Sequence, residues 1–572
     1  MKDYIRQIQL ELKLLTKSKL FKIGAILLIL ISLFGITFGH IVGAMFKDDG
    51  YNSWNEPVVV RDITVTNESD MFWEVREAVN SLQYLVESGN IDNGSEEYIF
   101  ADDLIYLFAK ASQSELDYLA NSLTRQIMEA EVKKFIVEKE YKTLDEVGVF
   151  YGGNANDYYF PFSVHDKEGL EKILKLTDEE KVTSIKEWND EIERKSNIVV
   201  NSDYIEYYKV EIELTQERIK DFQEEIVKLE ENMVDGNQTE IQKQIDGLKN
   251  SIESFETRTI PTLEYKIAND VKPKDDWRND ALNARDSFLS RKAYGPMKEE
   301  EFLENEYLIE EHGSYAKYLK VYQEQLAKDE KKYLIAVKAL ELNKPDIFYD
   351  RTGSREVALG FLSFSTMITL FGIMLSANTI AREFQNGTVR LLLIRPKTRI
   401  KIFGSKLIAI LILLLALHFI TQFGHMLAVG IDQGFAAFAY PKINPYSTTP
   451  FVLYFIWTLL ITYLPIVSLS SLAFAVSALL RRNAPSIALV MGAFFGSSIV
   501  SQMAMFMPKL SWVKWTPIPY FQFHQYFTGA TNMYYSNTTT LVLGNGIIIL
   551  VALSALSIGL GLWNLKVRDV TN

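Results

Sequence analysis

The chain has 572 residues and a net charge of −13, and its charges are segregated along the sequence. Residues 1–22 and 357–572 together hold 20 of the 60 basic residues and 5 of the 73 acidic residues. Residues 23–356 therefore hold 40 basic and 68 acidic residues. The acidity of that middle stretch excludes a nucleic-acid-binding surface, which has to be basic. The absence of cysteine excludes disulfides, thiolate metal sites and cysteine nucleophiles. A chain of this length also exceeds one ordinary domain.

Residues 1–22 combine lysines with apolar side chains at helical spacing, namely Ile5, Ile8, Leu12 and Leu15. This pattern predicts an amphipathic elbow helix on the cytoplasmic membrane surface. Residues 23–46 follow as an apolar run long enough to cross a bilayer, and too long for the apolar core of a signal peptide. We therefore expect an uncleaved first transmembrane helix.

Five further apolar runs predict spans over residues 357–377, 407–431, 451–480, 486–507 and 543–565. Pro465 predicts a kink or tilt in the overlong third of these runs. The predicted fold is thus mainly α, with a six-helix transmembrane bundle formed by residues 23–46 and the five-span domain 357–572. Residues 47–356 form a large, predominantly helical domain between the first two spans.

The distribution of lysine and arginine predicts the orientation. Basic residues are concentrated in residues 1–22, in residues 382–406, at Arg481 and Arg482, and in the C-terminal tail. Both termini are therefore expected in the cytoplasm, and residues 47–356 outside the cell membrane. A large extracytoplasmic domain without cysteine also fits a Gram-positive bacterium.

The middle domain contains two helical segments with apolar residues at spacings of three and four. Residues 204–270 are interrupted at 235–237 by Asp-Gly-Asn, which predicts an antiparallel coiled-coil hairpin. Pro261 is expected to end or kink the second helix. The hairpin could be a stalk, a dimer contact or a substrate-capturing element, although a plain scaffold is the simpler interpretation. Residues 299–342 are again expected to be helical.

The apolar runs hold almost no charge, and His40, His418 and His425 are the ionisable groups at plausible membrane depth. We expect these histidines to bond between helices or at the interface rather than to relay protons. Ion-driven carriers usually need acids or arginines along their path. An energy source outside this chain is therefore favoured.

Residues 382–406 carry the most specific motif, in a predicted cytoplasmic loop. Taken alone, an apolar run from Leu391 to Ile394 among basic residues indicates a short amphipathic element on the membrane. The segment resembles the first cytoplasmic loop of ABC-2-type permeases, with its R-E-x-x-x-G-T-x-x-x-L-L-x-x-P-x-x-R pattern. The matching residues are Arg382, Glu383, Gly387, Thr388, Leu392, Leu393, Pro396, Arg399 and Lys406. Arg390 departs from the pattern, where an acid is common.

This resemblance implies a permease that pairs as a homodimer or a heterodimer of related chains. Each permease would bind a separate cytoplasmic ATPase. Residues 382–401, including Arg390, would contain the coupling helix that docks on that ATPase, and Arg481 and Arg482 would form a smaller contact. This chain has no G-x-x-x-x-G-K-[ST] phosphate loop, so ATP and Mg are expected on the partner and no cofactor on this chain. The resemblance covers the membrane part and leaves the middle domain unassigned.

The favoured function is export of an amphipathic or hydrophobic substrate, such as a peptide, an antibiotic or a lipid. The main alternative is a surface scaffold or receptor of a Gram-positive secretion system, which has a similar layout but does not transport. A membrane enzyme or an ion-driven carrier is disfavoured, because the sequence shows neither a catalytic motif nor acids within the spans.

Overall fold

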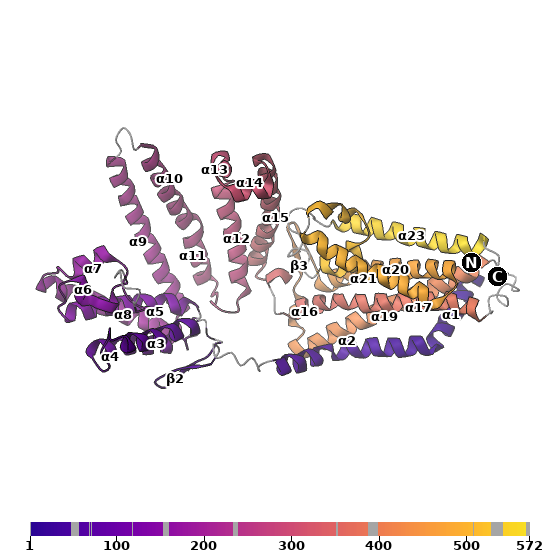
Figure 1. Cartoon of the computed structure of the whole chain (residues 1–572), viewed down its shortest axis with the longest axis horizontal. Helices are drawn as coiled ribbons and strands as arrows, with labels where there is room; N and C mark the ends of the chain where they lie inside the picture. The colour runs from indigo at the N-terminus through magenta and orange to yellow at the C-terminus, as the bar shows by residue number, and fades with distance from the viewer. Residues whose placement is uncertain are drawn as a thin grey trace. The chain divides into compact units, whose positions relative to one another are not determined.

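The structure, a computed structural model, describes residues 2–46, 56–67, 69, 71–116, 118–152, 160–232, 238–349, 353–386, 399–506, 508–527 and 542–567. The chain is mainly helical, as predicted (Figure 1). Strands in the described residues form two short antiparallel hairpins, β1 (Val58–Val60) with β2 (Ile63–Val65) and β3 (Lys442–Asn444) with β4 (Ser447–Thr449). The chain divides into two compact units, unit 1 (Met1–Asp48 with Arg291–Asn572) and unit 2 (Asp49–Ser290).

Unit 2 is built from helices in chain order. They are α3 (Phe72–Glu87), α4 (Glu96–Ala111), α5 (Tyr118–Glu138), α6 (Leu144–Val147), η2 (Gly148–Phe150), α7 (Lys167–Ile173), α8 (Asp178–Asn201), α9 (Tyr204–Glu231), α10 (Gln238–Ser254), η3 (Phe255–Thr259), α11 (Ile260–Ala268) and most of α12 (Trp277–Tyr294). Several begin at a side-chain cap. Thr177 and Glu180 form a reciprocal capping box that satisfies free amides at the start of α8.

Aromatic side chains form much of the core of unit 2. Phe100 stacks on Phe135 with ring centroids 4.1 Å apart, and Phe150 meets both rings edge-on. Phe160 is fully buried beside Phe150.

The two predicted hairpin helices are α9 and α10, which lie side by side (Figure 1). Ile226 of α9 packs with Ile241 and Ile245 of α10, and all three are buried. An apolar seam therefore joins these helices at the predicted positions. The coiled-coil assignment stays a prediction, and residues 233–237 lie outside the described part.

Pro261 does not end the second helix. The five residues before α11 form a π-helix, η3, and the chain then continues helically to Ala268. A wider turn of this kind absorbs the loss of the proline N–H without breaking the helix.

Unit 1 contains two N-terminal helices, α1 (Lys2–Lys17) and α2 (Lys19–Phe46). After α12 follow α13 (Glu299–Glu304), α14 (Glu306–His312), α15 (Tyr315–Leu342), η4 (Ile347–Tyr349), α16 (Ser354–Gly360), η5 (Phe361–Phe364), α17 (Ser365–Gln385), α19 (Arg399–Gln433), η6 (Ala436–Ala439), α20 (Phe451–Leu480), α21 (Asn483–Phe506), η7 (Pro508–Trp515), η8 (Pro519–Tyr526) and α23 (Leu543–Val567). Residues 299–342 are therefore helical, as predicted, with breaks near Asn305 and Gly313.

Five described helices are long and apolar enough to span a membrane: Ser354–Gln385, Ile400–Gln433, Phe451–Leu480, Asn483–Ala504 and Leu543–Asn564. Each coincides with one of the predicted runs. The predicted first span, residues 23–46, lies within α2, but the side chains of residues 35–46 are outside the described part. The count of six spans stays a prediction.

Small and polar side chains let the apolar helices pack closely. Gly372 of α17 faces Ser470 of α20, where a Cβ would come within 2.5 Å of the serine oxygen. His418 of α19 bonds to Thr462 and to the Leu459 carbonyl of α20, both at 3.2 Å. His425 approaches the Ser32 carbonyl of α2 at 3.1 Å. His418 and His425 therefore form hydrogen bonds between helices, as expected. The side chain of His40 lies outside the described residues.

A buried ionic network joins the segment before α16 to the β3–β4 hairpin. Asp346 is fully buried and accepts hydrogen bonds from Lys442 (2.8 Å) and from the Ile443 amide (2.7 Å). Arg355, also fully buried, donates to the carbonyls of Pro345 (2.9 Å) and Pro441 (3.3 Å). These bonds fix the start of α16 and the segment before it to the β3–β4 hairpin.

Candidate functional site

The predicted docking segment begins in the last turn of α17 and ends where α19 starts. Arg382 is exposed and Glu383 is half-buried at the end of α17. Arg399 is the first residue of α19, and its side chain is outside the described part. Residues 387–398 also lie outside it, and they include the predicted residues Gly387, Thr388, Arg390, Leu392, Leu393 and Pro396. The docking role of the segment stays a prediction, while its two ends can be described.

A buried ion triad connects these two ends to the N-terminal helix. The Lys406 ammonium of α19 lies 3.0 Å from the Glu11 carboxylate of α1 and 3.3 Å from the Glu383 carboxylate of α17. The Lys406 side chain is 8% exposed and that of Glu11 9% exposed. At such burial a charge is tolerated only with a partner, because the loss of hydration is not otherwise offset. One cation thus holds three helices together.

The triad explains how α1 is oriented. Helix α1 packs against α19. Gln7 and Glu11 lie on its buried face. Three of its apolar side chains stay exposed, namely Ile5 (49%), Leu10 (46%) and Leu14 (56%). Of the predicted apolar stripe, Ile5 is exposed, whereas Ile8, Leu12 and Leu15 are partly buried, and Leu10 and Leu14 lie outside that stripe. Whether α1 rests on a membrane surface stays a prediction.

The second predicted contact, Arg481 with Arg482, lies beside the end of α17. Arg481 ends α20 in a left-handed conformation (φ 53°), and its guanidinium carbon lies 5.1 Å from the centroid of the Phe384 ring. Close by, the side-chain nitrogen of Asn483 donates to the side-chain oxygen of Asn378 of α17 at 3.1 Å. Arg482 is exposed. The α20–α21 turn therefore lies beside the start of the predicted docking segment, although about a hundred residues separate them in the sequence.

Sequence reasoning missed Glu11 as part of this site. The residue stands out only as an acid on a short helix rich in lysine, and its partner is 395 residues away. Phe384 and Asn378 were missed for the same reason, since each acts through a contact distant in sequence. The described residues contain no group of three or more His, Asp and Glu side chains suited to a metal ion.

Five long apolar helices, with charged segments at their ends, define a multi-pass membrane protein. The chain belongs to the ABC-2 transporter family, because a model described as "ABC-2 family transporter protein" matches residues 106–570. The match begins in α4, so it extends beyond the membrane part that carries the sequence resemblance and into unit 2. A comparison with curated proteins found no match. Members of this family are membrane transport components that work with an ABC ATPase subunit.

Proposed function

We propose that this chain is the permease subunit of an ATP-driven exporter, powered by a separate cytoplasmic ATPase that binds ATP and Mg. Family membership supports the partnership. The observation that carries the proposal is the Glu11–Lys406–Glu383 triad, because it ties both ends of the predicted docking segment to each other and to α1.

The triad gives the docking segment a mechanical connection to the membrane helices. A push on residues 387–398 is delivered to α17 and α19 together, since Glu383 and Lys406 are bonded across the segment's ends. Helix α17 packs in turn along α20. ATP-driven closure of the ATPases would therefore move these helices as packed bodies rather than bend one loop.

The remaining features of the proposal follow from the charge and hydropathy pattern. Both termini and residues 382–406 lie in the cytoplasm, and most of residues 47–356 lie outside the cell of a Gram-positive bacterium. The resemblance to ABC-2-type permeases further implies that two permeases pair, either as a homodimer or with a related chain. The apolar interior of the helices suits an amphipathic or hydrophobic substrate such as a peptide, an antibiotic or a lipid.

Co-purification and ATP hydrolysis test the proposal. Full-length permease is isolated from native membranes, and the ATPase that accompanies it is assayed with and without the permease. Arg382→Glu and Arg482→Glu reverse exposed charges outside the triad, so we expect normal folding and loss of ATPase binding and stimulation. The control is Lys186→Glu, an exposed lysine of unit 2. Normal stimulation by both arginine variants would contradict docking at this surface.

A non-transporting scaffold or receptor is the second candidate, because unit 2 has a hydrophobic core of its own and occupies much of the chain. The two functions differ in their need for an ATPase. Absence of an ATPase from the purified complex and from the neighbouring genes would favour the scaffold.

A further inference from the structure

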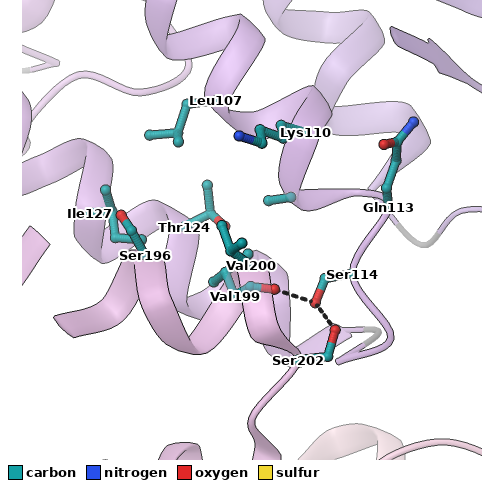
Figure 2. A pocket seen from close by; sticks show the side chains of 11 residues that line it. Leu107, Lys110, Gln113, Ser114, Thr124, Ile127, Ser196, Val199, Val200 and Ser202 are labelled. Carbon is teal, nitrogen blue, oxygen red and sulfur yellow. Dashed lines mark hydrogen bonds between the residues drawn. The ribbon is translucent and has the colours of Figure 1, made fainter. Parts of the chain in front are cut away.

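Unit 2 contains a pocket of about 250 Å³ between α4, α5 and α8 (Figure 2). Apolar side chains from all three helices line it, namely Leu107, Ile127 and Val199. Ile127 and Val199 are buried and Leu107 is partly buried, so these positions form a preformed apolar floor. The polar lining includes Lys110 and Ser196.

Lys110 gives the pocket a positive charge. Figure 2 shows its amine pointing toward the space between Leu107 and Thr124. No aspartate or glutamate is among the described lining residues, and within the described residues Lys110 has no carboxylate partner. This is unusual in a stretch of sequence with a large excess of acids. A cation at the edge of an apolar pocket favours a ligand with one negative charge.

The serines at one end of the pocket serve the fold rather than a ligand. The Ser114 hydroxyl lies 2.8 Å from the Val199 carbonyl and 3.0 Å from the Ser202 hydroxyl, as the dashed lines in Figure 2 show. The Ser202 hydroxyl also accepts from the Glu115 amide at 3.0 Å. These bonds engage the serines at that end of the pocket. The Thr124 hydroxyl donates to the Ala120 carbonyl, so Lys110, Gln113 and Ser196 are the polar lining groups left for recognition.

The volume limits the apolar part of the ligand. An engineered cavity of about 150 Å³ lined by apolar side chains holds benzene. A volume of about 250 Å³ therefore accommodates one aromatic ring or a branched aliphatic group with a short linker.

We propose that this pocket binds a small amphipathic monoanion, in which a carboxylate pairs with Lys110 and one ring-sized apolar group fills the space against Leu107, Ile127 and Val199. The C-terminal residue of a hydrophobic peptide and a free aryl or alkyl carboxylic acid share this chemistry. The site lies wholly within unit 2, and it does not depend on the exporter assignment.

Ligand-observed NMR on the full-length protein in nanodiscs of zwitterionic lipid tests the proposal, with empty nanodiscs correcting for partition into lipid. The probes are 4-phenylbutyrate and its neutral primary amide. We expect saturable binding of the acid with a Kd on the order of 1 mM. The amide should bind about fivefold more weakly, as the loss of a partly exposed ion pair predicts.

Two variants and one control assign the binding to this pocket. Lys110→Met keeps the aliphatic stem and should weaken the acid about fivefold without affecting the amide. Ser196→Trp fills the space and should abolish binding of both probes. Lys186→Met removes an exposed charge elsewhere on α8 and should leave binding unchanged.

A further probe, N-acetyl-alanyl-phenylalanine, distinguishes a peptide C-terminus from a free carboxylic acid as the ligand. If this acid binds at least as tightly as 4-phenylbutyrate, the pocket accepts peptide C-termini, whereas binding of 4-phenylbutyrate alone indicates a free acid. Equal binding of acid and amide would overturn the proposal. Binding that survives both Lys110→Met and Ser196→Trp, or no saturable binding of either acid, would also overturn it.

Discussion

Lys406 occupies an unusual position for a lysine, because its side chain is almost fully buried between two carboxylates at the start of an apolar helix. A buried ion pair adds little stability compared with a well-packed apolar substitute. Breaking one is costly, however, since the remaining charges stay buried without a partner. Lys406 therefore fixes which helices come together more than it adds net stability.

Replacing Lys406 by Met should destabilise unit 1 by about 3–5 kcal/mol, because the buried Glu11 loses its cation and the half-buried Glu383 loses it as well. Thermal unfolding of the protein in nanodiscs measures this loss. Lys401→Met, an exposed lysine on the same helix, is the matched control and should change little. Adding Glu11→Gln and Glu383→Gln to Lys406→Met should restore most of the stability. Failure of that rescue would show that the loss does not come from the uncompensated carboxylates.

Asp276 of unit 2 offers a pH-dependent contribution to stability. Burial raises the pKa of Asp276. Hydrogen bonds from the Arg278 side chain, from the Arg278 backbone amide and from the Lys272 backbone amide lower it, as does the positive charge of Arg278. Together they place the pKa of Asp276 below its ordinary value. The Arg278 Nε lies 2.9 Å from the carboxylate, and Arg278 also donates to the Asn269 and Asp270 carbonyls. The pair thus braces the connection between α11 and α12.

The sign of the pH effect follows from the lowered pKa of Asp276. Its contribution is complete above the unfolded-state pKa of about 3.9 and is lost as the pH falls through the folded-state pKa. We expect Asp276→Asn to lose about 1–3 kcal/mol at pH 7 and to flatten the acid limb of stability below about pH 5. Protease resistance of unit 2 across this range provides the measurement, with exposed Asp190→Asn as the control. An unchanged acid limb in Asp276→Asn would contradict the assignment.

The sequence alone identifies a functional residue only where that residue and its neighbours in the chain form a recognisable motif. The motif around Arg382 and Glu383 is local, so it could be found before the structure was known. Glu11, Phe384 and Asn378 gain their roles from contacts across the fold, which no local spacing encodes. Residues 387–398 stay assigned by resemblance alone.

At the scale of elements, the apolar helices were predicted well because hydrophobic length is a direct signal of a span. Residues 451–480 coincide with α20, and Pro465 lies inside that helix without ending it. Helices α17 and α19 extend beyond the apolar runs predicted from the sequence. The polar residues that flank an apolar run can also form a helix, so hydropathy does not mark where the helix ends. Pro261 predicted a local disturbance of the helix, but the sequence does not distinguish a helix end from the π-helix that precedes the proline in the structure.

Gly372 tests whether the close α17–α20 packing matters. A side chain here meets Ser470 at 2.5 Å and Leu414 at 2.9 Å, so Gly372→Val should overpack the interface and cost about 1–3 kcal/mol. Gly360→Ala, at a glycine whose added Cβ meets no atom within 4 Å, is the control. Thermal unfolding in nanodiscs compares the two. Equal stability of the two variants would mean that these helices can separate without loss.

At the scale of the whole molecule, the membrane topology is open to direct test because the chain has no cysteine. Single cysteines at Lys186, Lys17 and Lys401 place one reactive group in unit 2 and two on the predicted cytoplasmic side. In intact cells, a membrane-impermeant maleimide should label Lys186→Cys and leave Lys17→Cys and Lys401→Cys unlabelled until the cells are opened. Labelling of Lys17→Cys in intact cells would reverse the predicted orientation.

The ion triad also has a consequence for biosynthesis. Glu11 leaves the ribosome before Lys406, which follows 395 residues later. At about 5–20 residues per second, Glu11 waits roughly 20–80 s for its partner. During that interval the face of α1 that carries Gln7 and Glu11 lacks its contact with α19. Helix α1 is therefore made well before the helix on which it docks, and its ion pair with Lys406 forms only after α19 has been synthesised.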